Sequence, residues 1–387
     1  MKSATAALVT REIDPTDRAE LDRFIELPFR LYRDCPCWTP PLRVEMRDRM
    51  NPRKNKFFEH SSAAFIVAEK TGNVVGRIAV LKHRFYNEVH QNDTAFFYWF
   101  EAENEQAIAD ALFAAAETWA RSRGLRRLLG PIGFIQPDPP GILVQGFEHE
   151  GTVDVPWHFP YLESLVTGAG FAQHRDYLSG YLGRDVPLPP ALAKTGAERL
   201  RELGYRSELL GGRRAIKSWA DQFYHTYLTA FEAVPDFYAM SRRDFQDLMD
   251  RLSLVIDVKR TQGISDGDNL VGFILCFRDI TPGLRRARGR LFPFGWWHLL
   301  LSRLRSRQCN IIALGVLPAY QKSGANLAML AEFLRTVRQG NDERTEIVQI
   351  VEGNLNTHGD MTRLGAKWDK VHRVYRRDFA GLTTLSP

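Results

Sequence analysis

The alternation of apolar and polar residues predicts the same series of elements twice along the chain. Each copy is predicted as a strand, a hairpin strand, a third strand, an amphipathic helix, a fourth strand, a short helix ending in glycine, and closing β segments. In the first copy these elements lie at residues 64–68, 73–80, 95–100, 106–121, 128–130, 161–170 and 177–182. In the second copy they lie at residues 254–258, 269–276, 311–316, 327–337, 347–351, 358–365 and 371–379. Such a shared order is difficult to obtain by chance, so we predict an internal repeat.

The matched order predicts two copies of one α/β unit that join near residues 186–190. Pro187, Pro189 and Pro190 can neither continue a strand nor donate to its hydrogen-bond ladder. We therefore expect an N-terminal domain over residues 1–186 and a C-terminal domain over residues 187–387. The order of elements resembles the GNAT acyltransferase fold. This resemblance implies an α/β protein with α+β mixed sheets, built from two tandem GNAT-like acyl-CoA N-acyltransferase domains.

The composition is that of a folded protein. Of 387 residues, 44% are hydrophobic and 25% are charged, which excludes a disordered or collagen-like chain. The net charge of +6 does not by itself imply a nucleic-acid partner. The four cysteines are too few for a disulfide framework and the histidines lack metal-ligand spacing, so we expect no metal. No apolar run approaches the ~20 residues that span a bilayer, and the N-terminus does not resemble a signal peptide, so we expect a cytoplasmic protein.

A segment that leaves a predicted strand and enters a predicted helix has the features of a pyrophosphate site. A glycine-containing loop at a helix N-terminus presents unpaired N–H groups and the positive end of the helix dipole. Gln321-x-x-Gly324 resembles the coenzyme A signature R/Q-x-x-G-x-G/A of GNAT proteins, although Asn326 replaces the final small residue. An ordinary strand-to-helix turn is the alternative. The residues expected to bind acyl-CoA are Leu314, Val316, Gln321, Lys322, Ser323, Gly324, Ala325 and Asn326.

The corresponding segment of the first copy, residues 101–106, predicts no second coenzyme A site. It is rich in glutamate and lacks a glycine, and its carboxylates would repel phosphate groups. We therefore expect the first domain to be degenerate and to shape the site of the acceptor.

Acyl transfer to an amine needs a base for the ammonium proton and donors for the oxyanion. Glu352 ends the strand that GNAT enzymes separate from its neighbour around the thioester, so it is the expected base; a solvated strand-end carboxylate is the alternative. Asn354 resembles an asparagine that contacts coenzyme A in GNAT relatives. Met361 replaces the tyrosine that usually protonates the leaving thiolate. His158 is a second candidate base, or else a hydrogen-bonded core residue among aromatics.

A basic and aromatic insertion at residues 282–307 precedes the predicted cofactor loop. It contains seven arginines and no acidic residue. Arginines could meet anionic headgroups while apolar side chains enter the membrane surface, and the apolar stretch is too short to span a bilayer. A buried hairpin and a nucleic-acid surface are the alternatives, although consecutive leucines suit base stacking poorly. The residues expected to contact lipid are Phe292, Trp296, Trp297 and Leu300.

The sequence more narrowly resembles a bacterial family of tandem GNAT-like acyltransferases. The resemblance rests on segments such as Pro28-Phe29-Arg30-Leu31-Tyr32, Gly130-Pro131-Ile132-Gly133-Phe134 and Gly289-Arg290-Leu291-Phe292-Pro293. The family includes the bacterial ceramide synthase. This implies transfer of a long-chain acyl group from acyl-CoA to a sphingoid base, giving (dihydro)ceramide, by a protein peripheral to the inner membrane and without a nucleic-acid partner. The alternatives are acyl or aminoacyl transfer to a soluble amine, and a catalytically inactive GNAT scaffold or regulator.

Overall fold

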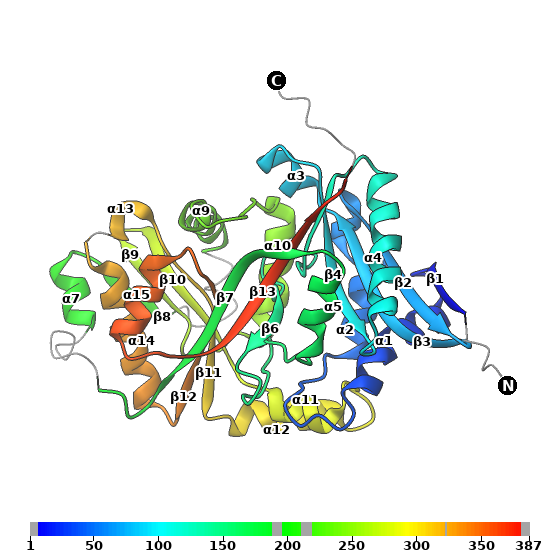
Figure 1. Ribbon diagram of the computed structural model, residues 1–387. Helices are drawn as coiled ribbons and strands as arrows, with labels where there is room; N and C mark the ends of the chain where they lie inside the picture. The colour runs from blue at the N-terminus through cyan, green and yellow to red at the C-terminus, as the bar shows by residue number, and fades with distance from the viewer. Residues whose placement is uncertain (1–6, 188–195, 210–218, 322, 381–387) are drawn as a thin grey trace. The chain divides into compact units, whose positions relative to one another are not determined.

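The computed structural model describes residues 7–187, 196–209, 219–321 and 323–380, and Figure 1 shows its elements. The chain forms two compact units. The first unit combines Met1–Tyr177 with Leu284–Trp296 and Lys370–Pro387, and the second combines Leu178–Gly283 with Trp297–Asp369. The domain boundary expected after residue 186 stays a prediction.

The sheet of the first unit is mixed, and its strands follow the chain in order. It contains β1 (Leu8–Glu12), β2 (Ser62–Lys70), β3 (Asn73–Lys82), β4 (Thr94–Ala102) and β5 (Arg127–Gly130). Neighbours are antiparallel except β4 and β5, which are parallel. Next to β5, residues 375–378 of β13 (Lys367–Asp378) pair antiparallel with residues 127–130, and β6 (Ile142–Gln145) also pairs with β13. The last strand of the chain therefore completes the sheet of the first unit.

Helices cover both faces of this sheet because successive side chains along its strands point to opposite faces and are apolar on both. Ala64, Ile66 and Ala68 of β2 join one core with residues of α4 (Gln106–Arg121). On the opposite face, the Phe65 ring meets the ring of Phe24, on α1 (Arg18–Leu31), with centroids 5.7 Å apart. Figure 1 shows α4 beside β2. The remaining helices of this unit are α2 (Arg43–Met50), η1 (Lys56–Glu59), α3 (Arg84–His90) and α5 (Tyr161–Gly168).

The second unit repeats this arrangement. Its strand order is β8 (Arg206–Leu209), β9 (Gln262–Asp266), β10 (Asn269–Arg278), β11 (Gln308–Val316) and β12 (Arg344–Val351), with only β11 and β12 parallel. One face packs on α14 (Ala325–Gln339) and the other on α9 (Ala220–Phe231) and α10 (Arg242–Val255). The further elements are α7 (Gly196–Glu202), α13 (Pro318–Gln321) and α15 (Leu355–Arg363). The strand β7 (Ala172–Gly183) and the helices α11 (Thr281–Ala287) and α12 (Gly295–Arg305) have residues on both sides of a unit boundary.

The predicted order of elements is confirmed in both copies, but the strand predicted at residues 254–258 is wrong. Val255 ends α10, and Ile256 makes only an isolated bridge to Phe277. The hairpin partner of β10 is instead β9, which turns through Gly267 at φ +59°. The sequence of β9 has a single branched aliphatic side chain, Ile264, so its hydrophobic pattern is weak.

Candidate active site

In each unit the two parallel strands pair only where they begin. In the second unit the pairing joins Gln308–Ile311 of β11 to Arg344–Ile347 of β12, while residues 312–316 and 348–351 continue without it. In the first unit it joins residues 94–96 of β4 to residues 127–129 of β5. Strands that separate in this way leave backbone N–H and C=O groups available to a ligand.

The loop that follows β11 contains the residues predicted to bind acyl-CoA. Val316 is buried at the strand end, and the side-chain amide of Gln321 donates to its carbonyl oxygen at 2.9 Å. Leu314 is half-buried on the same strand. Gly324 caps α14 in the left-handed conformation, at φ +84°, and among the described residues, apart from its two chain neighbours, no atom lies within 4 Å of the position that a Cβ would occupy. This open, left-handed glycine is what close approach of a phosphate to the backbone requires.

The first turn of α14 is held by hydrogen bonds of Ser323 and Asn326. Ser323 accepts a hydrogen bond from the Ala325 N–H at 3.3 Å. Asn326, the departure from the small-residue signature, is 9% exposed, and its amide donates to the carboxylate of Asp360 on α15. Asn326 is therefore used in packing α14 against α15. The residues fit a pyrophosphate at this helix N-terminus; Lys322, also predicted to bind it, lies outside the described residues.

Glu352 and Asn354 follow β12. Glu352 is exposed, and in the described structure its carboxylate makes no ion pair or hydrogen bond. The side-chain oxygen of Asn354 accepts from the Thr357 N–H at 3.2 Å and so caps α15. Met361 is 1% exposed and belongs to the core of this unit. Glu352 is thus available for proton transfer. Asn354 has a structural role as a helix cap, and a contact with coenzyme A would be a second role.

His158 lies in the first unit, before α5. Its Nδ1 accepts a hydrogen bond from the Leu143 N–H at 3.2 Å, and its ring centroid is 6.2 Å from that of His372. Burial, with a smaller contribution from His372, lowers the pKa of His158 to about 3. A neutral imidazole with an occupied Nδ1 and so low a pKa is a weak base at neutral pH. These features weigh against the predicted catalytic role of His158, which stays a prediction.

The first unit has no loop like that of the second. Only residues 103–105 separate β4 from α4. Glu103 pairs with Arg30, and Glu105 pairs with Lys70. Glu101, within β4, is 8% exposed and accepts a hydrogen bond from the Tyr32 hydroxyl at 2.6 Å. Burial raises the pKa of Glu101 to about 7, although the charge of Arg77 opposes the shift.

A second carboxyl of the first unit with a raised pKa, the half-buried Asp154, was not expected from the sequence. Burial is the main cause that raises the pKa of Asp154 to about 7; Glu45 raises it further, and Arg49 opposes the shift. Its backbone lies in the left-handed region at φ 61°. Tyr98, on β4, is 8% exposed. Burial raises the pKa of its hydroxyl, and the charge of Asp154 raises it further. No motif marks Asp154, because its surroundings are assembled from segments far apart in the sequence.

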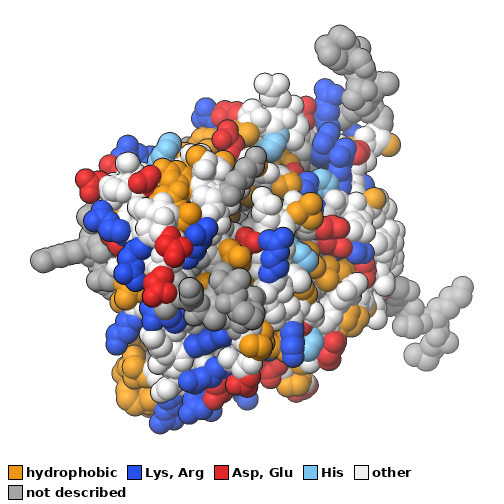
Figure 2. All heavy atoms as spheres, turned by 90° about the vertical axis from the view of Figure 1, so that its left-hand side faces the viewer, with side chains coloured by type: hydrophobic (Ala, Val, Ile, Leu, Met, Phe, Trp, Pro, Cys, Tyr) orange, Lys and Arg blue, Asp and Glu red, His pale blue; other side chains and the backbone are white. Residues whose placement is uncertain are grey.

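The residues predicted to contact lipid are exposed. Phe292 is 80% exposed and Phe294 69%, in the segment between α11 and α12. On α12, Trp296, Trp297 and Leu300 are 40–49% exposed. Figure 2 shows hydrophobic side chains gathered beside lysine and arginine side chains toward the lower edge of one face. Among the described residues, no helix is both long enough and apolar enough to cross a membrane.

The backbone of the insertion is bound to the first unit, while its apolar side chains remain exposed. The Arg43 N–H donates to the Gly289 carbonyl oxygen at 2.9 Å, and the Arg43 guanidinium donates to the carbonyl oxygen of Arg288. Gly289 has φ +71°, and a Cβ there would lie 2.5 Å from the Pro41 carbonyl oxygen. Part of the insertion's backbone is therefore held by hydrogen bonds, as in the hairpin alternative. Its apolar side chains stay exposed, as the membrane hypothesis requires.

Comparison with known proteins finds both a family model and whole-chain relatives that this chain resembles. Residues 27–131 match the model of the acetyltransferase (GNAT) family. The chain is 26% identical over 370 residues to Protein YghO of Escherichia coli (strain K12), covering 93% of each chain. It is also 26% identical over 379 residues to a protein named bacterial ceramide synthase, from Caulobacter vibrioides, covering 93% of this chain and 95% of the relative.

Solved structures share the fold over nearly the whole chain. A tandem GNAT protein from the clavulanic acid biosynthesis pathway aligns with a TM-score of 0.57 at 14% identity, covering 97% of this chain and 100% of that one. A GCN5-related N-acetyltransferase from Sphaerobacter thermophilus aligns with a TM-score of 0.56 at 13% identity, covering 97% of each. The predicted fold class is thereby confirmed. The chain carries two tandem copies of the GNAT fold, and its fold and family match are those of acyl-CoA-dependent N-acyltransferases.

Proposed function

We propose that this protein transfers a long-chain acyl group from acyl-CoA to the amine of a sphingoid base, giving (dihydro)ceramide, at the cytoplasmic face of the membrane. The observation that carries the proposal is the loop at Gly324, open and left-handed, between a strand that has left its parallel neighbour and the N-terminus of α14. Its backbone N–H groups would hold the pyrophosphate, and coenzyme A supplies the thioester. The name of the Caulobacter relative supports the choice of a lipid amine.

In the proposed reaction the chain's own groups orient the substrates and move one proton. Glu352 accepts the proton of the substrate ammonium, and the free amine then attacks the thioester carbonyl carbon. The C–N bond forms and the C–S bond breaks, so that coenzyme A leaves as its thiolate, and the nitrogen loses its second proton to solvent as the amide forms. Met361 is buried in the core and cannot donate a proton to that thiolate. The thiolate therefore leaves unprotonated or takes its proton from solvent.

The exposed apolar side chains support a lipid acceptor over a soluble one. A large exposed apolar patch beside basic residues marks a partner or a membrane surface. Phe292 and Phe294 are the clearest members because little of either ring contacts the protein. An enzyme for a soluble amine has no need of such a wedge.

The test is a reconstituted assay with the purified protein. A long-chain acyl-CoA is offered together with a sphingoid base in mixed micelles and with an equal concentration of a soluble primary amine, and the amide products are identified by mass spectrometry. We expect the long-chain amide to dominate. An amide of the soluble amine alone would favour acyl transfer to a soluble acceptor, and the absence of either amide would favour an inactive scaffold.

The membrane component has its own test in the variant Phe292→Ser/Phe294→Ser. Burying one such ring is worth about 1.5–3 kcal/mol, so we expect vesicle affinity to fall tenfold or more. Val89→Ser is the control, because Val89 on α3 is also exposed, at 57%, but lies outside the insertion. Transfer to a soluble amine should be unchanged in both variants. Unchanged vesicle binding by the double variant would remove the wedge from the proposal.

A further inference from the structure

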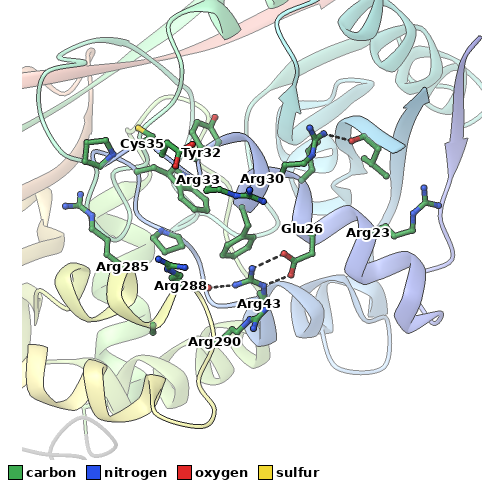
Figure 3. Close-up of a pocket in the computed structure, with 18 of the residues that line it drawn as sticks. Arg23, Glu26, Arg30, Tyr32, Arg33, Cys35, Arg43, Arg285, Arg288 and Arg290 are labelled. Atoms are coloured by element: carbon green, nitrogen blue, oxygen red, sulfur yellow. Dashed lines mark hydrogen bonds and ion pairs between the residues drawn. The ribbon is translucent and has the colours of Figure 1, made fainter. Parts of the chain in front are cut away.

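The first unit contains a cavity of about 980 Å³ whose lining includes eight arginines (Figure 3). It lies between α1, the segment that leads to α2, and the part of the insertion that belongs to this unit. Its volume is typical of sites for small molecules or headgroups. The arginines that line it are Arg23, Arg30, Arg33, Arg43, Arg285, Arg286, Arg288 and Arg290, and the carboxylates are Glu26 and Asp34.

Half of these arginines are neutralised by carboxylates and build the walls. Arg43 is the most buried of them: Glu26 accepts two of its hydrogen bonds, and its guanidinium lies 3.4 Å from the centroid of the Phe29 ring. Figure 3 shows Arg43 between Glu26 and the insertion. The other ion pairs are Arg23 with Glu69, Arg30 with Glu103, and Arg285 with Glu150.

Among the described residues, the other four arginines form no ion pair, although the charge of Arg290 contributes to lowering the pKa of Glu26, after the hydrogen bond and charge of Arg43. In the described part of the chain, the side chains of Arg33, Arg286, Arg288 and Arg290 make neither an ion pair nor a hydrogen bond, and all four are exposed. Asp34 is the one lining carboxylate, within the described residues, that also makes no ion pair or hydrogen bond. The positive charge left over is therefore concentrated where the cavity meets solvent.

The cavity also has an aromatic wall. The Tyr32 and Trp38 rings stack with centroids 5.1 Å apart, and Phe29 meets Trp38 edge-on at 5.3 Å. A wall of rings beside guanidinium groups suits a molecule that joins an anionic group to an apolar or glycerol-like part.

We propose that this cavity binds a phosphate-bearing headgroup, with the unpaired guanidiniums donating to the phosphate oxygens. Arginine donates two parallel hydrogen bonds to a phosphate, which makes such a site more selective than a diffuse basic surface. The exposed Phe292 and Phe294 follow Arg290 closely in the sequence. A membrane phospholipid is therefore the source that we choose over a soluble phosphate; this choice rests on the proposed membrane-face function.

The test measures binding rather than turnover, so that it does not depend on the acceptor. The full-length protein and the variant Arg286→Gln/Arg290→Gln are floated with vesicles of phosphatidylcholine containing phosphatidylglycerol, and with vesicles of phosphatidylcholine alone. Calorimetry with coenzyme A and with glycerol 3-phosphate forms the soluble arm. The control is Arg18→Gln/Arg53→Gln, which removes the same charge from exposed residues of the same unit that do not line the cavity.

We expect the cavity variant to bind phosphatidylglycerol vesicles at least tenfold more weakly, the control to stay within about twofold, and coenzyme A affinity to be unchanged. An equal loss in the control would show diffuse attraction and overturn the proposal, as would unchanged vesicle binding by the cavity variant. A loss of coenzyme A affinity with unchanged vesicle binding would assign the cavity to the donor and reject the lipid. If the protein proves to acylate only soluble amines, the proposed function fails while this result can still stand.

Discussion

The two units share a fold but connect the third strand to the long helix differently. In the second unit, residues 317–324 separate β11 from α14 and include the left-handed Gly324. In the first unit, residues 103–105 make the same connection between β4 and α4, and Glu103 and Glu105 are paired with basic side chains. A phosphate placed at this connection would meet an open backbone in the second unit and carboxylates in the first. The same fold thus carries an open glycine loop in one copy and a short connection with two glutamates in the other.

The units also differ in which of their titratable groups have shifted pKa values. In the first unit, Glu101 and Asp154 have pKa values raised to about 7 by burial. In the described part of the second unit, the groups whose pKa shifts have a clear direction are tyrosines, arginines and a cysteine, none of which titrates near pH 6. The first unit, with its short connection between β4 and α4, thus still contains carboxyls whose pKa values are raised toward neutrality. Each difference can be tested by substitution.

The largest effect is expected at Glu352. Glu352→Gln keeps the shape of the side chain but cannot accept a proton, so turnover should fall by about 10²–10⁴ while acyl-CoA binds as before. Because Glu352 is exposed and makes no ion pair or hydrogen bond in the described structure, the substitution should not disturb folding. Glu232→Gln, at an exposed carboxylate after α9, is the matched control. A loss below tenfold, measured by steady-state kinetics, would transfer the role to another base or to water.

The second effect is expected at Gly324 and separates phosphate binding from backbone strain. Gly324→Glu adds bulk and negative charge to the loop, so acyl-CoA affinity measured by calorimetry should fall at least 100-fold. Gly204→Glu is the control, since Gly204 has φ +83° and, among the described residues beyond its two chain neighbours, no atom within 4 Å of its Cβ position. Both variants carry the same strain, of about 1–2 kcal/mol. Equal acyl-CoA affinity in the two variants would show that Gly324 is an ordinary helix cap.

The third effect concerns stability and pH, and it is confined to the first unit. A carboxyl whose folded pKa is raised favours the folded state most when protonated, so its contribution is lost as pH rises from about 4.5 to about 7. Deprotonation of each of Glu101 and Asp154 should lower the free energy of unfolding by about 1–3 kcal/mol at pH 8 relative to pH 4.5. The variant Glu101→Gln/Asp154→Asn should flatten this dependence.

Hydrogen exchange followed by mass spectrometry at pH-corrected times assigns the loss to a unit. His158 and His372 of the same unit have pKa values lowered by burial and act in the opposite direction, so the wild type is compared with the double variant at each pH. Relative to the double variant, wild-type peptides of β4 and of residues 151–157 should lose protection as pH rises, and peptides of β10 and β12 should not. An equal difference in the second unit would contradict the comparison, and so would a wild type and a double variant whose stabilities change with pH in the same way.

Much of the fold was predictable because it depends on local apolar periodicity. The amphipathic helix predicted at residues 106–121 has the observed bounds, since its apolar side chains repeat at helical spacing against the sheet. The hairpin strand β9 was missed because its sequence is mostly polar and it is held by ladder pairing with β10. The pairing of the end of β13 with β5 was also unpredictable, because strand register between distant segments has no local signature.

The candidate site divides in the same way. The Gly324 loop could be found from sequence, because a short motif with a glycine at a strand-to-helix junction predicts the left-handed backbone that begins the helix. The cavity of the first unit could not, because residues 23–43 and 285–290 come together only in the folded chain. The arginines of the insertion were visible in the sequence, but the sequence did not distinguish those used in ion pairs from those left unpaired.

The smallest effect is expected at Asn354, where a structural role and a binding role can be separated. Asn354→Ser keeps an oxygen that can accept from the Thr357 N–H, so the cap of α15 and the thermal stability should change little. The substitution removes the amide N–H groups, and one lost hydrogen bond to coenzyme A is worth about 0.5–1.5 kcal/mol, or about two- to tenfold in affinity. Asn354→Ala removes both the capping oxygen and the amide N–H groups, and it should also destabilise the protein by about 1 kcal/mol. If Asn354→Ser binds acyl-CoA as tightly as the wild type in calorimetry, Asn354 is only a helix cap, and the donor contacts of the second unit are limited to the loop before α14.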